Sequence, residues 1–324
     1  MANDKVEKQL ESLRALRGMG LTAEASAALK KALADRVNIV VAKAAQICVD
    51  LEAVALVPDL KKAFERFFDK GKDPQCWAKN ALAKALKDLG VRESAVFLRG
   101  VRHVQNEPVW GGQEDTAAVL RGACAMALVQ CNDIARDETL RYLVDALSET
   151  AATVRMDAAA ALAQMDGREV ALLLRLKARL SEKDPRVTGQ VLEALLHIEG
   201  TAALPFLAEF LERSDEAAEE AALALGASRM PEAVELLRET WEKWQGQRPG
   251  TALLRAMSAS RLDQAIDFLI DLIKQARQPD AEDALHALAL NKATEEMVSR
   301  VEQAVKQRDD AKLSSIFQQR FRLE

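Results

Sequence analysis

Histidine and cysteine are the residues that most often bind metals or act as nucleophiles, and both are scarce in this chain. The histidines lie far apart, at His103, His197 and His286, and no two of the cysteines form a close pair, at Cys48, Cys76, Cys124 and Cys131. A metal centre or a Cys–His nucleophile needs two or more such side chains in contact. The sequence therefore predicts reduced, buried cysteines and a protein that is not an enzyme and has no metal or cofactor.

Phosphate chemistry is not indicated either. The glycine pair Gly111–Gly112 lies in the segment WGGQED, which lacks the lysine and the hydroxyl residue of a phosphate-binding loop. Carboxylates are abundant, with 50 Asp and Glu residues, but no pair stands out by its spacing as a general acid and base. The elements that carry these residues are more informative than the residues themselves.

A pattern of small and aliphatic residues recurs along the chain at intervals of 31 to 43 residues. In each occurrence a key residue is followed, four and five positions later, by another small or aliphatic pair, such as Ala158–Ala159. The key residues are Val40, Trp77, Leu120, Val154, Val187, Ala218 and Ala252. Repetition at this period is typical of stacked supersecondary units. The sequence predicts an all-α fold, an α-solenoid or superhelix built from two-helix repeats.

The composition agrees with an all-helical fold. Hydrophobic residues make up 49% of the 324 residues and aromatic residues only 4%, so the apolar surface is mostly Ala, Leu and Val, which suits closely packed helices. No low-complexity segment divides the chain, so we expect a single domain over residues 1–324. No signal peptide is apparent, and no apolar run reaches the roughly 20 residues of a membrane span. We expect a soluble, cytoplasmic monomer that does not bind membranes.

Residues 137–240 resemble the bacterial HEAT-like repeat found in phycobilin lyases. The resemblance rests on an acidic residue before the second helix of a repeat, at Asp184 and Asp215, and on the pair Val154–Arg155. An Asp at this place also has a physical role, since its carboxylate accepts hydrogen bonds from the unpaired amides at the helix start. Outside this range the pattern is looser, and Asp73 stands displaced from the acidic position.

The resemblance implies a complete architecture for the chain. About eight two-helix HEAT-like repeats are expected over residues 21–292. A capping helix is expected within residues 1–20, where an amphipathic pattern starts the chain, and capping helices within residues 293–324. A repeat array needs such caps because each terminal repeat has one unpartnered face.

In HEAT-like proteins the second helix of each repeat usually lines the concave surface, so the resemblance places a partner there. Counted over the predicted second helices, the net charge is more negative than the −5 of the whole chain. An acidic surface attracts a basic protein or peptide segment and repels nucleic acid. The candidate partner-binding residues on these helices are Asp157, Gln190, Glu193, His197, Glu219 and Arg255.

Residues 105–115 form the longest connection without helical character. A proline and two glycines surround Trp110 and interrupt helix formation. Because tryptophan is enriched at the centres of interfaces, Trp110 and the nearby Glu114 and Asp115 are further candidate binding residues. The alternative is that the indole folds back and covers the groove between neighbouring helices.

Residues 61–102 are rich in lysine and arginine and contain five aromatic residues, a combination that can indicate nucleic-acid binding. The helical spacing favours another interpretation. Trp77 falls on the apolar arc of its helix, whereas Lys79, Lys84 and Lys87 fall on the opposite arc. We therefore expect the aromatic residues in the core and the lysines in solvent, and nucleic acid is not an expected partner.

These features favour a protein–protein interaction scaffold or adaptor. A repeat array offers an extended surface to a partner protein or peptide, and no residue constellation demands a reaction. The resemblance implies two alternatives, because a fold does not fix a function. One is a chromophore-handling protein related to the phycobilin lyases. The other is a DNA glycosylase of the alkylation-repair kind, which is also built from HEAT-like repeats and is expected to have a basic groove.

Overall fold

The computed structural model describes residues 2–18, 20–69, 71–213, 215–244, 250–291 and 294–321. The chain divides into two compact units, Met1–Met165 and Asp166–Glu324. Within the described residues the regular structure is helical apart from one hairpin of two short strands. The predicted all-α repeat fold is confirmed.

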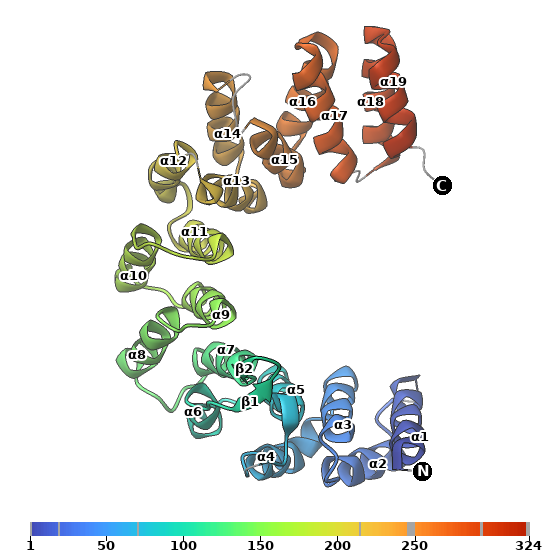
Figure 1. Cartoon of the computed structure of the whole chain (residues 1–324), viewed down its shortest axis with the longest axis vertical. Helices are drawn as coiled ribbons and strands as arrows, with labels where there is room; N and C mark the ends of the chain where they lie inside the picture. Colours follow the sequence, from blue (N-terminus) through green and yellow to red (C-terminus); the bar gives the residue numbers. More distant parts are fainter. Residues whose placement is uncertain are drawn as a thin grey trace. The chain divides into compact units, whose positions relative to one another are not determined.

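The first unit contains a terminal helix followed by four two-helix repeats (Figure 1). In each repeat we name the helices first and second in chain order. The second helices α3, α5, α7 and α9 pack against one another in series, and α1 packs on α3. The helices are α1 (Ala2–Ala15), η1 (Leu16–Gly18), α2 (Ala23–Leu33), α3 (Asn38–Asp50), η2 (Val54–Leu56), α4 (Val57–Arg66), η3 (Pro74–Cys76), α5 (Trp77–Asp88), α6 (Ser94–Val101), α7 (Ala118–Leu128), α8 (Arg136–Leu147) and α9 (Ala152–Leu162).

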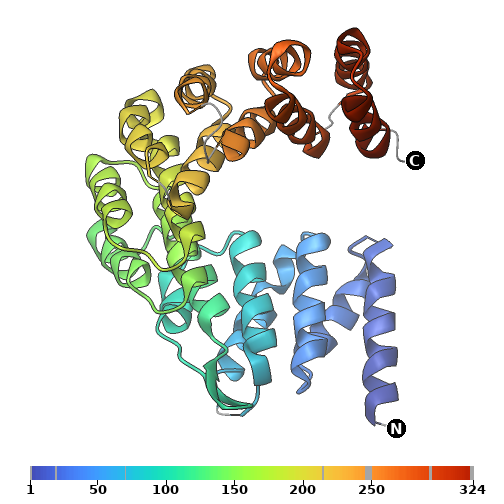
Figure 2. The ribbon, with the colours of Figure 1, turned by 45° about the horizontal axis from the view of Figure 1, so that its top comes forward.

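The second unit repeats the same arrangement. Its second helices α11, α13, α15, α17 and α19 pack in series, with the first helices along their other side (Figures 1 and 2). The C-terminal pair continues the pattern, because α18 packs on α16 and α19 on α17. The helices are α10 (Arg168–Arg179), α11 (Pro185–Glu199), η4 (Gly200–Ala203), α12 (Leu204–Leu211), α13 (Glu216–Ser228), α14 (Pro231–Lys243), α15 (Gly250–Ser260), α16 (Asp263–Gln275), α17 (Gln278–Leu290), α18 (Glu295–Arg308) and α19 (Ala311–Phe321).

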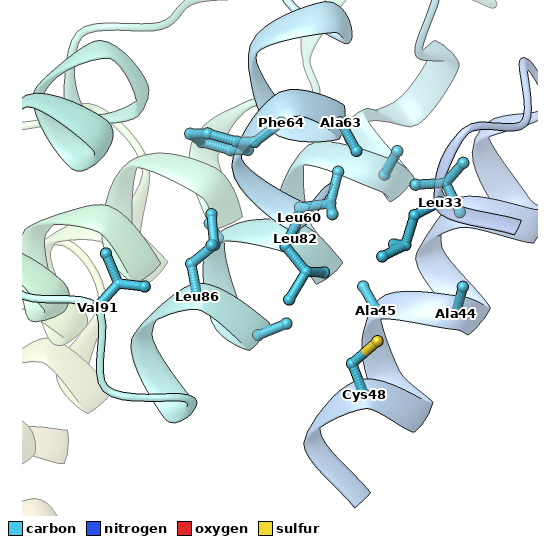
Figure 3. Packing of buried hydrophobic residues seen from close by; sticks show 14 of the residues in the cluster. Leu33, Ala44, Ala45, Cys48, Leu60, Ala63, Phe64, Leu82, Leu86 and Val91 are labelled. Carbon is cyan, nitrogen blue, oxygen red and sulfur yellow. The ribbon is translucent and has the colours of Figure 1, made fainter. Parts of the chain in front are cut away.

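Small residues allow the second helices to approach one another closely. In the first unit, Ala44 and Ala45 of α3 are fully buried in one cluster with Leu82 of α5 (Figure 3). In the second unit, a Cβ atom added to Gly226 of α13 would lie 2.2 Å from the carbonyl oxygen of Ala256 in α15. Close packing of this kind fixes how the exposed side chains of adjacent helices line up.

Aspartates stand before several second helices, as the sequence predicts. The Asp184 carboxylate accepts a hydrogen bond from the second backbone amide of α11, at 3.1 Å. Asp215 precedes α13, and its carboxylate pairs with a neighbouring arginine. Asp73 is displaced from this position, as expected, because η3 separates it from α5, yet it still serves the helix start. Its carboxylate accepts hydrogen bonds from the amides of Ala78 and Lys79, at 3.0 and 2.9 Å.

The predicted key residue Ala252 of α15 is only partly buried, and Leu253 beside it is fully buried. The predicted register is likewise wrong by one residue in two other second helices. Trp77 is 51% exposed, and Ala78 takes the buried key position of α5. Leu223 of α13 is 46% exposed, because Ala221 and Ala222 form the buried pair in that helix. In both helices a run of small and aliphatic residues satisfies the pattern in either register, so the sequence could not distinguish them.

One segment, Pro185–Leu211, is long and apolar enough to be considered as a membrane span, with a mean hydropathy of 1.4 over its most apolar window, so the expected absence of such a run is wrong. The segment contains α11, η4 and α12. Gly200, with φ of 59°, interrupts it after α11. Its apolar residues Leu192, Leu195 and Leu207 are buried in the second unit, so helix packing explains the composition.

Candidate protein-binding surfaces

Residues 105–115 fold into a β-hairpin at the start of α7. Strands β1 (Asn106–Val109) and β2 (Gly112–Asp115) pair antiparallel, with Val109 opposite Gly112. The turn therefore consists of Trp110 and Gly111, and Gly111 has a φ of 90° that favours glycine. The expected irregular loop is thus a regular element with a defined tip.

The Trp110 side chain is fully exposed at this tip, at 103% of its reference area. The alternative in which the indole covers a groove between helices is therefore wrong. Val109 next to it is 40% exposed, and Glu114 on the opposite strand is also exposed. A large apolar side chain in water contributes nothing to folding, whereas it is well suited to burial in an interface.

The base of the hairpin is fixed by hydrogen bonds to residues on both sides of it. Glu107 of β1 accepts hydrogen bonds from the backbone amide of Gln75 at 2.8 Å and from its side-chain amide at 3.1 Å. Gln75 and Cys76 both have positive φ, 60° and 51°, a conformation that costs energy in non-glycine residues and persists where the surroundings hold it. Glu107 is part of that support.

Asp115 is the last residue of β2. Its Oδ1 accepts from the amides of Gln105 and Ala117, both at 3.0 Å, and its Oδ2 pairs with Arg121 at 2.6 Å. Burial raises the pKa of this carboxyl, but the amides and the guanidinium outweigh that effect and lower the pKa below its usual value. Asp115, predicted as a partner-binding residue, is committed to the base of the hairpin.

Lys79 is buried beneath the hairpin, so its predicted place on a solvated basic face is wrong. Its Nζ donates to the carbonyl oxygen of Phe67 at 3.2 Å and to Oε1 of Gln105 at 2.5 Å, and it lies 3.8 Å from a carboxylate oxygen of Asp73. The Gln105 side chain in turn donates to the Asp73 carbonyl oxygen at 2.8 Å. The Lys79 ammonium thus links the start of α5 to Gln105, the residue directly before β1.

Arg121 of α7 joins the hairpin to the next repeat. The residue is only 4% exposed. Its guanidinium donates to the His103 carbonyl oxygen at 2.9 Å, in addition to its pair with Asp115, and its Nε lies 2.9 Å from Oε1 of Glu149. A buried charge needs such partners. The hairpin is therefore anchored to α5, α7 and the α8–α9 turn, and its tip is presented by a rigid base.

The predicted residues of the second helices divide between the two units. Asp157 lies in α9 of the first unit and is partly buried over Gly122 of α7, where an added Cβ would lie 1.9 Å from its carboxylate oxygen. Burial raises its pKa, although Lys87 acts in the opposite direction. Asp157 therefore contributes to helix packing rather than to an exposed polar stripe.

The remaining predicted residues lie on the surface of the second unit. Glu193 and His197 of α11, Glu219 of α13 and Arg255 of α15 are exposed, and Gln190 of α11 is partly buried. The second helices α11, α13, α15 and α17 carry eight carboxylates and two arginines. The acidic second-helix surface expected from the sequence is thus present in this unit.

The carboxylates are most concentrated around the start of α13. We call Glu193, Glu216, Glu219 and Glu220 the acidic surface. Burial raises the pKa of Glu220, and the charges of Asp184, Glu219 and Glu216 raise it further, against the opposing effect of Arg186. A raised carboxyl pKa next to like charges indicates a negative local potential. Such a potential attracts cations and disfavours phosphate.

The thiols show no sign of activation. Burial raises the pKa of Cys48 to about 12 and that of Cys131 to about 11, with smaller contributions from nearby acids. Burial also raises the pKa of Cys76 and Cys124. Reactive cysteines have the opposite property, a lowered pKa. Within the described ranges, no group of three or more His, Cys, Asp or Glu side chains is placed to hold a metal ion.

Sequence reasoning missed the two groups that hold the hairpin, Lys79 and Arg121. One signal was available for Arg121, since the Val-Arg pair of the repeat pattern places an arginine directly after a key residue. Arg155 in α9 has the same place and is likewise buried, donating to the carbonyl oxygens of Glu149 and Thr150 at 2.7 and 2.8 Å. Lys79 has the same place in α5, directly after the buried key residue Ala78, but the predicted register put Trp77 at the key position and hid this signal.

The chain matches no protein-family model and no curated protein sequence. Several solved structures are similar to it. Three of them are the YibA protein of Escherichia coli (TM-score 0.42, 16% identity, 83% of this chain and 96% of that chain), the CpcE–CpcF complex of phycocyanin lyase from Nostoc (0.39, 17%, 76% and 94%) and human deoxyhypusine hydroxylase (0.29, 19%, 77% and 87%). All three are HEAT-like helical repeat proteins. At these TM-scores they assign neither an activity nor a partner to this chain.

Proposed function

We propose that this protein is a cytoplasmic, non-enzymatic HEAT-like scaffold that binds a partner protein through the hairpin tip of its first unit. The observation that carries the proposal is the fully exposed Trp110 on a hairpin whose base is anchored by Glu107, Asp115 and Arg121. Hydrogen bonds at the base fix the hairpin before a partner arrives. Preorganisation of this kind lowers the entropic cost of binding.

The acidic surface of the second unit is a separate candidate contact, which favours a basic segment. Glu193, Glu216 and Glu219 are exposed, and no ion pair involves them within the described residues. Their attraction for a basic segment falls as salt screens it. Association is therefore expected to have an apolar part at Trp110, which salt leaves intact, and an electrostatic part, which salt removes.

A quantitative pull-down from the native cell lysate tests the proposal, with bound proteins measured by mass spectrometry at low and high salt. Trp110→Ala is expected to reduce capture of the partner, because loss of an interface tryptophan typically costs about 2 kcal/mol or more, roughly 30-fold in affinity. Trp77→Ala is the matched control, since Trp77 is a half-exposed tryptophan of the same unit, outside the hairpin. Equal loss in both variants would exclude the hairpin as the binding element.

Charge reversal separates the two contacts. Glu193→Lys combined with Glu219→Lys is expected to weaken capture at low salt and to have little effect at high salt. Lys61→Glu combined with Lys62→Glu, on the first helix α4, is the control. If the purified protein instead binds duplex DNA at physiological salt and loses that binding when Lys84 and Lys87 are reversed, the scaffold proposal is overturned in favour of a nucleic-acid function.

A further inference from the structure

Three successive second helices of the second unit enclose a pocket away from the acidic surface. The pocket has a volume of about 420 Å³, within the range of small-ligand sites. It is lined by Thr251 and Arg255 of α15, Asp283, His286 and Leu290 of α17, and Arg320 of α19. These helices pack in series, α15 on α17 and α17 on α19, so the pocket is formed by the repeat arrangement itself.

The polar lining of this pocket favours an anion. The lining contains two guanidinium groups, an imidazole and one acidic residue, Asp283, whose carboxylate already accepts a hydrogen bond from the Thr251 hydroxyl at 2.9 Å. Arg255 and His286 make no hydrogen bond or ion pair with any described residue of the chain. Arginine presents paired N–H donors that match a carboxylate. Arg255 and His286 are therefore available as donors to a ligand.

The pocket also has an apolar wall. Leu290 at the end of α17 is 67% exposed, and Ala289 precedes it in the lining. An exposed leucine gains free energy when a ligand covers it, by about 25 cal/mol for each Å² removed from water. A ligand that carries an apolar group beside its anionic group would contact both parts of the lining.

We propose that this pocket binds a carboxylate that is carried next to an apolar side chain. A carboxylate has a single negative charge, whereas a phosphate at neutral pH has nearly two, and the fixed charge of Asp283 repels the second more strongly. Two kinds of molecule carry such a carboxylate, namely a peptide at its C-terminus and a free organic acid. The inference goes beyond the scaffold function, because a small acid can occupy the pocket whether or not a partner binds the hairpin.

The probe is N-acetyl-leucine, which carries one carboxylate and one apolar side chain. Titration followed by NMR of the full chain is expected to give a dissociation constant of about a millimolar, as ligand efficiency predicts for a molecule of this size. N-acetyl-leucine amide, which lacks the charge, is expected to bind at least about tenfold more weakly. A peptide with a C-terminal leucine separates the sources: tighter binding than N-acetyl-leucine assigns the pocket to peptide termini, and equal binding assigns it to free acids.

Variants locate the site. Arg255→Gln and His286→Gln are each expected to weaken binding of N-acetyl-leucine at least about fivefold. Arg238→Gln on the first helix α14 is the control, because Arg238 is an exposed arginine of the same unit that lies outside the pocket. Binding of the acid and of its amide with equal affinity would overturn the proposal. So would unchanged affinity in Arg255→Gln and His286→Gln, or tighter binding of inorganic phosphate than of N-acetyl-leucine.

Discussion

In the first unit, the second helices α5, α7 and α9 bury charged residues, namely Lys79, Arg121 and Arg155. In the second unit, no charged residue among the described residues of the second helices is fully buried, and the buried polar residues are hydroxyls, at Thr188, Thr240, Ser258 and Ser260. Both units use the same two-helix repeat. The units differ because repeats of the first unit also support an inserted hairpin.

Two of the buried charges of the first unit, Lys79 and Arg121, occur where the chain leaves the repeat pattern, whereas Arg155 donates to backbone carbonyl oxygens just before its own helix. Lys79 and Arg121 contact the hairpin or residues at its base, such as Gln105 and Asp115. Burying a charge is costly unless hydrogen bonds and an opposite charge compensate it. The hairpin supplies part of that compensation, so the inserted segment and the buried charges depend on each other. The second unit has no such insertion in its described residues, and its buried residues there include no charged side chain.

The largest expected effect comes from removing the buried ammonium. Lys79→Ala leaves the carbonyl oxygen of Phe67 and the side-chain oxygen of Gln105 without their donor and the Asp73 carboxylate without its nearest cation. Loss of one member of a buried pair typically costs about 3–5 kcal/mol. Urea unfolding followed by circular dichroism measures the change.

Lys84→Ala is the control for this prediction, because Lys84 is exposed on the same helix α5. A surface substitution of this kind changes stability by less than about 0.5 kcal/mol. If Lys79→Ala costs no more than Lys84→Ala, the buried charge does not hold the hairpin, and the contrast between the two units disappears.

The fold was predictable because the signal is repeated. Key residues such as Val40, Leu120 and Val187 are all fully buried, and each repeat gives independent support for the same two-helix unit. Single positions within one repeat were less reliable. Trp77 and Leu223 were placed in the core because runs of alanine and leucine satisfy the pattern in two registers, and only packing against neighbours decides between them.

The candidate site was predictable only in part, for a physical reason. A proline and two glycines around Trp110 identified a non-helical segment, and that segment contains the hairpin. Lys79 directly follows the buried key residue Ala78, but the one-residue error at Trp77 hid this, and its partner Gln105 lies 26 residues away in the sequence, so no local pattern could indicate the contact. The same holds for Asp157, which is packed over a glycine of the preceding second helix.

Replacing one glycine in each unit by alanine tests the comparison with a smaller expected change in stability. Gly226→Ala in the second unit would place a Cβ atom against the backbone of Ala256, which cannot move without shifting α15. We expect a loss of about 1–3 kcal/mol in stability. Gly122→Ala in the first unit meets the Asp157 side chain, whose carboxylate can rotate away but whose Cβ atom, at 3.0 Å, must shift slightly. The helix-propensity gain of about 1 kcal/mol offsets part of this cost, so thermal unfolding should show a smaller loss than for Gly226→Ala.

The smallest expected effect depends on pH. Burial raises the pKa of Asp157 above its usual 3.8, so the charged form is less favourable in the folded state than in the unfolded state. Asp157→Asn removes this penalty with little change in shape. At neutral pH, above both pKa values, the variant is therefore expected to unfold at a higher temperature than the wild type.

The difference between Asp157→Asn and the wild type is expected to shrink as the pH falls. Below its raised pKa the folded wild type takes up a proton at Asp157 before the unfolded chain does, so the wild type regains stability between that pKa and about 3.8. Thermal unfolding at neutral and acidic pH measures both values. Asp145→Asn, at an exposed carboxylate of α8, should show no comparable pH dependence. If the two variants respond alike, Asp157 is solvated like a surface acid, and the packing of α7 against α9 tolerates charge as readily as the surface of the second unit does.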